Sequence, residues 1–122
     1  MIKGLGNDIL EITRIRAIIN KHKRRFLKKF FNPNELNYCL MHKDLVPHLA
    51  GRFTAKEAIA KAIGTGFGSS LSFLDIEILN DALGRPYPRF SNRFNEIFET
   101  PHIILSISHC KKYASAIALW VS

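Results

Sequence analysis

The sequence predicts one α+β domain over residues 1–122, with helices packed on a mainly antiparallel sheet. Helical apolar spacing dominates the first half of the chain, whereas alternating or β-branched segments at 75–79, 103–107 and 113–121 dominate the second. With 47% hydrophobic and 23% charged residues the composition is that of a globular protein, and no repeat or low-complexity linker divides the chain. These observations favour a single folding unit.

The first half begins with a short apolar segment, 1–6, that predicts a strand ending in a tight turn at Gly4 and Gly6. Residues 14–30 predict a helix whose buried side carries the residues Ile15, Ile18, Ile19, His22, Phe26 and Phe30. A cap residue, a proline and a glutamate at 32–35 start another helix. The helix-forming run 52–62 predicts a further helix that ends at Gly64.

In the second half, residues 75–79 alternate like a strand, and 81–84 form the turn that sends the chain back through 85–88. The prolines of that return segment favour an edge strand. Ser91 is placed to cap a short helix carrying Phe94, Ile97 and Phe98. Segments 103–107 and 113–121 then predict two strands joined near 109–112.

On the helix expected at 52–62, Glu57 and Lys61 are four residues apart and share a face, whereas Lys56 lies on a different side. Such a pair has two interpretations. It is either an ordinary solvated pair, which stabilises a helix by about 0.2–0.5 kcal/mol, or an acid and a base held together for chemistry.

Asp8 directly follows the glycine-containing segment. An acid just past a strand end is well placed for a site, and two carboxylates suit Mg²⁺, which keeps several waters and binds substrate phosphates. The alternative role for Asp8 is the N-cap of a helix that begins near Ile9. Asp8 and Glu57 are therefore candidate metal ligands.

Four blocks of sequence resemble the 4'-phosphopantetheinyl transferases of the short bacterial holo-[acyl-carrier-protein] synthase type. They are Gly4-Leu5-Gly6-Asn7-Asp8-Ile9, Gly51 to Ala58 with Lys61, Gly64-Thr65-Gly66, and Ser106-Ile107-Ser108-His109. The blocks agree with that family in order and spacing and span nearly the whole chain.

The resemblance implies transfer of phosphopantetheine from coenzyme A to a serine of apo acyl carrier protein, with release of adenosine 3',5'-bisphosphate, in fatty acid biosynthesis. It implies that Asp8 and Glu57 bind Mg²⁺. Glu57 is then the candidate to take the serine proton, directly or through a water, and Lys61 to stabilise or protonate the leaving phosphate.

The resemblance also implies a coenzyme A site that includes Arg52, Lys61, Gly64 and His109. From the residues alone, Arg52 can equally be an exposed arginine at a helix end, and His109 can be a polar turn residue. The glycines at 64–68 are either ordinary loop residues or a nest of backbone N–H groups that binds phosphate. The family is typically a homotrimer with active sites between subunits. The apolar positions Ala114, Ala116, Ala118 and Trp120 are compatible with such an interface and equally with a core.

The net charge of +8 is uneven, because no acid occurs between Glu11 and Glu35. The basic face of this segment is either a solvated surface without a partner or a site for a polyanion, which can be nucleic acid, an anionic membrane or an acidic protein. The resemblance implies that this partner is an acidic acyl carrier protein, for which Arg14, Arg24 and Lys28 are the candidate contacts. A carrier domain of a larger synthase is an alternative client.

The competing class is a small nucleic-acid-binding protein that stacks bases on Phe26, Phe30 and Phe31. No nucleic-acid motif occurs, however, and those rings fall on the apolar stripe.

Cys39 and Cys110 are too few and too far apart for a zinc site, so we expect free thiols. No apolar run approaches the roughly 20 residues that span a bilayer, and the chain does not start like a signal peptide. We therefore expect a cytoplasmic protein with neither a membrane span nor a nucleic-acid partner.

Overall fold

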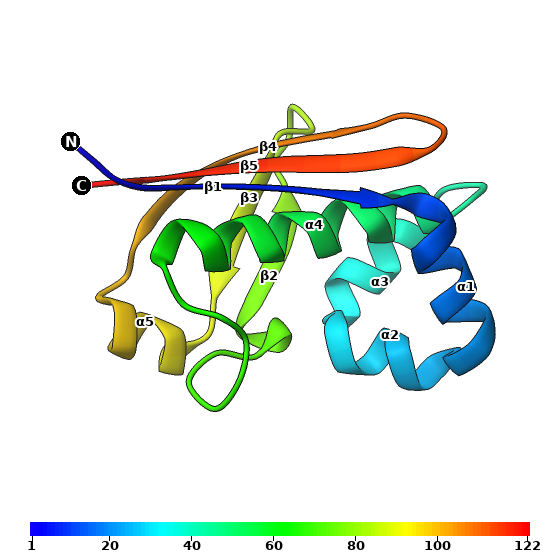
Figure 1. Cartoon of the computed structure of the whole chain (residues 1–122), viewed down its shortest axis with the longest axis horizontal. Coiled ribbons are helices and arrows are strands. Elements are labelled where there is room, and N and C mark those ends of the chain that lie inside the picture. The colour runs from blue at the N-terminus through cyan, green and yellow to red at the C-terminus, as the bar shows by residue number, and fades with distance from the viewer.

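The structure is a computed structural model that describes the backbone of residues 1–122 and every side chain except that of Arg24. Helices and strands follow one another in an order that confirms the α+β class (Figure 1). The elements are β1 (Ile2–Glu11), α1 (Ile12–His22), α2 (Arg24–Phe30), α3 (Pro33–Leu40), α4 (Val46–Ile63), the 3-10 helix η1 (Phe73–Asp75), β2 (Ile76–Asn80), β3 (Pro86–Phe90), α5 (Asn92–Phe98), β4 (His102–His109) and β5 (Tyr113–Val121).

A three-stranded antiparallel sheet with the order β1-β5-β4 covers one side of the central helix α4 (Figure 1). Helices α1, α2 and α3 gather at one end of α4, whereas α5 lies at the other end. The hairpin of β2 and β3 forms a separate two-stranded sheet. Helix α4 is therefore the element around which the rest of the chain is organised.

Glycines let β1 approach α4 more closely than any other residue would allow. A Cβ atom on Gly6 would lie 1.9 Å from the carbonyl oxygen of Ala58, and one on Gly4 would lie 2.0 Å from that of Ala62. The turn predicted at these glycines is wrong, because β1 continues to Glu11 and carries Asp8 within it. The alternative role of Asp8 as a helix N-cap is also wrong, since α1 begins only at Ile12.

The basic segment forms two helices, not the single helix predicted over 14–30. The helix is interrupted at Lys23, whose φ of 46° lies outside the right-handed helical region. The break lets Ile15 and Phe26 join one core with residues of α3 and α4, while Ile18 and His22, predicted to be buried, are exposed. Both misassigned positions lie within α1, whose buried side carries Ile12 and Ile15, whereas Phe26 beyond the break is buried as predicted.

The helix ends that were predicted from local capping signals are confirmed. The cap, proline and glutamate at 32–35 form a capping box with proline in the first turn of α3. Ser91 caps α5 by accepting a hydrogen bond from the Phe94 amide. Helix α4 ends as predicted at Gly64, in the left-handed conformation with φ 87°, although it begins six residues before the predicted run.

A buried ion pair ties α4 to the helical end of the molecule. Lys56 lies on a different side of α4 from Glu57, as predicted, and its Nζ is 2.7 Å from Oε1 of Glu35 with both side chains fully buried. The same Nζ donates to the carbonyl oxygens of Phe30 and Phe73. Glu35 in turn accepts from the backbone amides of Asn32 and Ile78. Every charge in this pair is compensated, which is what burial requires.

The two faces of the three-stranded sheet differ. Ala114, Ala116 and Ala118 face α4 and are buried, so this face belongs to the core of the chain itself. The opposite face exposes large apolar side chains: Leu5, Ile9, Ile104, Tyr113 and Ile117. Such a contiguous exposed apolar face is typical of an interaction surface. None of the described helices combines the length and hydropathy that crossing a bilayer requires.

Candidate functional site

The structure brings together three of the predicted site residues, Asp8, Glu57 and Lys61. Lys61 Nζ lies 3.0 Å from Oδ1 of Asp8 and 3.0 Å from the carbonyl oxygen of Asn7. The Asp8 side chain is 21% exposed and that of Lys61 is 54% exposed, so the pair faces solvent. An acid and a base that are 53 residues apart in the chain thus meet where β1 crosses the last turns of α4.

Glu57 completes this group electrostatically. Partial burial raises the pKa of its carboxyl group, the negative charge of Asp8 raises it further, and the positive charge of Lys61 opposes both. Two carboxylates close enough to repel each other are stabilised by a bound cation. The ordinary solvated Glu57–Lys61 pair is therefore not the arrangement that the structure has, because Lys61 forms its ion pair with Asp8.

The donor set fits Mg²⁺ better than a metal that is caged by protein alone. No group of three or more His, Cys, Asp or Glu side chains among those described is placed to hold a metal ion. Two carboxylates that leave room for water and phosphate oxygens match the coordination that Mg²⁺ prefers. We call Asp8, Glu57 and Lys61 the carboxylate half-site.

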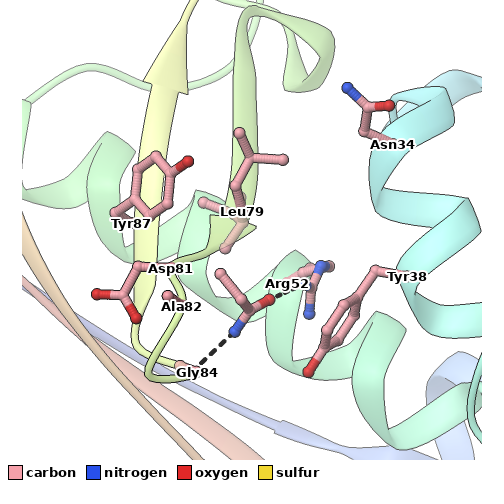
Figure 2. A pocket seen from close by; sticks show the side chains of 10 residues that line it. Asn34, Tyr38, Arg52, Leu79, Asp81, Ala82, Gly84 and Tyr87 are labelled. Atoms are coloured by element: carbon pink, nitrogen blue, oxygen red, sulfur yellow. Dashed lines mark hydrogen bonds between the residues drawn. The ribbon is translucent and has the colours of Figure 1, made fainter.

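Arg52 belongs to a different place. It is 5% exposed in the middle of α4, so the alternative of an exposed arginine at a helix end is wrong. Its guanidinium lies 4.2 Å from the ring centre of Tyr38 and donates to the side-chain oxygen of Asn80, between α3 and the β2–β3 hairpin (Figure 2). Its Nε has no protein partner. The guanidinium lines a cavity of about 420 Å³ and retains a buried donor for a ligand.

His109 is the last residue of β4 and is exposed. Together with Arg52, Tyr38, His48 and Asn80 it lines a smaller cavity of about 160 Å³. The structure thus places Arg52 and His109 at one cavity. We call Arg52, His109 and the residues around this cavity the arginine half-site.

Within one chain the two half-sites are separated. Five residues along α4 place Arg52 and Glu57 about 140° apart around the helix axis. Asp8 lies on β1 and His109 on β4, with β5 between these two strands. The predicted site is therefore not a single cavity of one chain.

Gly64 lies near the carboxylate half-site and far from Arg52. It follows α4 directly, three residues after Lys61, and twelve residues of helix place it about 18 Å along the axis from Arg52. Its left-handed φ of 87° accounts for the glycine structurally, and a Cβ there would meet open space. The prediction that it contacts a phosphate stays a prediction.

Two of the three candidate partner contacts are described and free for association. Arg14 on α1 and Lys28 on α2 are exposed, and neither forms an ion pair with a described acid, whereas the side chain of Arg24 lies outside the described residues. Phe26 and Phe31 are 6% and 2% exposed. Because those rings fill the core, they are not available to stack on bases, which removes the main argument for nucleic-acid binding.

Sequence reasoning missed several residues around Arg52, above all Tyr38, Asn80 and His48. Asn80 follows the strand predicted at 75–79 and is the last residue of β2, just before a turn, a position from which polar side chains often enter sites. No comparable signal marks His48, whose neighbours His42 and His109 come from other parts of the chain.

The family model for the 4'-phosphopantetheinyl transferase superfamily matches residues 4–118. Holo-[acyl-carrier-protein] synthase of Protochlamydia amoebophila is 53% identical over 122 residues, covering 100% of both chains. The crystal structure of that synthase from Neisseria meningitidis superposes with a TM-score of 0.93 at 34% identity, covering 100% of both chains. That of the Helicobacter pylori synthase in complex with coenzyme A superposes with a TM-score of 0.87 at 35% identity, covering 96% of this chain and 99% of that one.

The fold, the carboxylate half-site and these matches define a class of protein, a group-transfer enzyme. The chain belongs to the 4'-phosphopantetheinyl transferase superfamily, as an enzyme of the holo-[acyl-carrier-protein] synthase type.

Proposed function

We propose that this protein transfers the 4'-phosphopantetheine moiety of coenzyme A to a serine of apo acyl carrier protein, in a Mg²⁺-dependent reaction that releases adenosine 3',5'-bisphosphate and serves fatty acid biosynthesis. The observation that carries the proposal is the meeting of Asp8, Glu57 and Lys61 at the end of α4. The free thiols Cys39 and Cys110 suit a reducing compartment such as the cytoplasm.

In the proposed reaction the serine oxygen attacks the β-phosphorus of coenzyme A, and the bond to the oxygen that bridges the two phosphates breaks. Asp8 and Glu57 would hold Mg²⁺, which neutralises negative charge on the pyrophosphate. Glu57 accepts the serine proton, directly or through a water. Lys61 stabilises the departing phosphate.

The arginine half-site is proposed to bind the 3'-phosphate and adenosine end of coenzyme A. Arg52 offers a planar fork of donors whose Nε is unpaired, and His109 faces the same cavity. Because one chain separates this half-site from the carboxylate half-site, we propose that a neighbouring subunit supplies it. A homotrimer buries the exposed apolar face of the β1-β5-β4 sheet and repeats the shared site three times.

The basic face of α1 and α2 is proposed to dock the acidic carrier protein. Arg14 and Lys28 are exposed there and without a described ion-pair partner. Charges at the rim of an interface act mainly on the rate of association and on its dependence on salt.

Intact-mass measurement of apo acyl carrier protein, incubated with this protein and coenzyme A, tests the reaction. We expect a mass gain of one phosphopantetheine with Mg²⁺ and none with a chelator. Asp8→Ala and Lys61→Met should lose activity by on the order of 10²–10³ while remaining folded, with Lys3→Met as the matched control on the same strand. No mass gain on several carriers, from folded protein supplied with metal, would refute the proposal.

Mixing two inactive variants tests the shared site. Asp8→Ala spoils one half-site and Arg52→Met the other, so interfaces in a mixed trimer that combine the two intact halves should regain activity. Random mixing predicts about a quarter of the wild-type sites. Failure of the mixture to regain activity, although subunits are shown to exchange, would place both half-sites within one chain.

A further inference from the structure

Three histidines from separate parts of the chain meet beside the arginine half-site. His42 follows α3, His48 lies in the first turn of α4 and His109 ends β4. The ring centres of His42 and His48 are 3.6 Å apart, and those of His48 and His109 are 5.3 Å apart. We call these residues the histidine cluster.

The surroundings of the histidine cluster are basic. The rings border a cavity of about 610 Å³ that Arg16, Lys43 and Lys111 also line. Among the described residues Asp44 is the only carboxylate that lines it, and Asp44 already pairs with Arg16 at 2.8 Å. An excess of cationic and protonatable groups around a cavity attracts anions.

His48 connects this cavity to the arginine half-site. His48 and His109 line the 610 Å³ cavity, and both also line the smaller cavity beside Arg52. A phosphate group bound by Arg52 and His109 therefore lies within the surroundings of His48.

The cluster is not arranged as a metal site, since no three described His, Cys, Asp or Glu side chains are placed to bind one ion. The hydrogen bond of the His42 ring defines which of its two nitrogens carries the proton. Nδ1 of His42 lies 3.1 Å from the carbonyl oxygen of Tyr38, which only accepts, so Nδ1 carries the proton. In the neutral ring the opposite nitrogen lacks a proton, and it becomes a donor only when the ring is protonated.

Several groups hold the pKa of His48 below its ordinary value. Burial is the largest cause, followed by the positive charges of His42, His109 and Arg52, while the negative charge of Asp44 opposes them. A dianionic phosphate beside these rings would reverse the balance, because it favours the charged imidazole.

We propose that His48, supported by His42, is a further binding residue that takes up a proton when the enzyme binds the 3'-phosphate of its substrate. The inference rests on the proposed function and deepens it, because it makes recognition of a phosphomonoester dependent on pH. Besides the cluster, the charged and titratable groups that line its cavities with His48 are Arg52 on α4, Tyr38 on α3, Asp44 with its partner Arg16 on α1, and Lys43, Cys110 and Lys111 on the loops.

The direction of the effect follows from linkage. If the bound state has the higher histidine pKa, binding takes up a proton, and affinity rises as the pH falls through that pKa. A rise of one unit for one histidine is worth at most about a tenfold gain in affinity. The phosphate has its own second pKa near 6, but this titration is the same for every variant and cancels when variants are compared.

Calorimetric titration of the full-length protein with coenzyme A and with 3'-dephospho-coenzyme A, at pH 6 and pH 8, tests the proposal. The measured quantity is the preference for coenzyme A, the ratio of the two dissociation constants. In the wild type we expect this preference to increase from pH 8 to pH 6. That increase should be up to about tenfold larger than the corresponding increase in His48→Gln. His42→Gln should show a smaller loss, and the exposed His22→Gln serves as the matched control.

A second measurement does not depend on a variant that folds. The Cε1–H resonance of His48, followed by NMR from pH 5 to 8.5, should show a higher pKa with adenosine 3',5'-bisphosphate than without it. An unchanged pKa, or a His48→Gln preference that varies with pH as in the wild type, would overturn the inference while leaving the proposed function intact. Absence of coenzyme A binding by the wild type would overturn both.

Discussion

Breaking the buried Lys56–Glu35 pair should destabilise this protein more than any surface charge change. In Lys56→Met the methionine fills much of the lysine volume, but the Glu35 carboxylate stays fully buried without its counter-charge. The carbonyl oxygens of Phe30 and Phe73 also lose a donor. Removing one partner of a buried pair costs about 3–5 kcal/mol, a large share of the roughly 5–15 kcal/mol that typically stabilises a domain.

The measurement is urea unfolding followed by circular dichroism at pH 7 and one fixed protein concentration, because an oligomer makes apparent stability concentration-dependent. Adding Glu35→Gln to Lys56→Met removes the unpaired charge and keeps an acceptor for the backbone amides of Asn32 or Ile78, so about 2 kcal/mol should return. The matched control is Arg16→Met, which breaks an ion pair whose side chains are 46% and 49% exposed and should cost less than about 1 kcal/mol.

The reasoning is refuted if Lys56→Met costs no more than Arg16→Met, or if the double variant is less stable than Lys56→Met alone. Either result would mean that the pair is hydrated or rearranged in solution and that its charges are not confined to a dry interior. Since Lys56 precedes Glu57 on α4 and anchors a different side of the helix, the same variant should also lower transferase activity.

Three other predictions follow from the structure. Burial and the charge of Asp8 raise the pKa of Glu57 in the folded protein above its value in the unfolded chain. The folded state therefore loses stability as the pH rises from the unfolded pKa through the folded pKa, because Glu57 ionises more readily in the unfolded chain. Glu57→Gln should therefore unfold at a higher temperature than the wild type at pH 7 in chelator, with a gain of about 0.5–1 kcal/mol, and the gain should vanish at pH 3; equal melting points at pH 7 would contradict this. Gly6→Ala should cost at least about 2 kcal/mol in urea unfolding because its Cβ meets a backbone oxygen of α4 at 1.9 Å, whereas Gly66→Ala, with open space around it, should be nearly neutral. Arg14→Glu with Lys28→Glu should raise the KM for carrier protein by about tenfold or more at low salt and leave the KM for coenzyme A unchanged; equal changes in both constants would exclude a docking role.

Local signals in the sequence were sufficient for most of the elements. The capping box at 32–35, the serine cap of α5 and the glycine that ends α4 each act within a few residues, so they can be read without knowing the fold. The break at Lys23 has no such signal, because neither glycine nor proline marks it, and burial of Phe26 and Ile15 in one core favours it.

The candidate site also has features that the sequence predicts and features that only the tertiary structure creates. That Glu57 and Lys61 share a face follows from the helical period alone, and the uneven charge of residues 12–34 follows from composition. Only the tertiary structure places Asp8 against Lys61, pairs Lys56 with Glu35 and brings Tyr38 and Asn80 to Arg52. The physical reason is range: caps and periodicity depend on neighbours in the chain, whereas these contacts join segments that are tens of residues apart and exist only once β1, α3 and the hairpin have packed around α4.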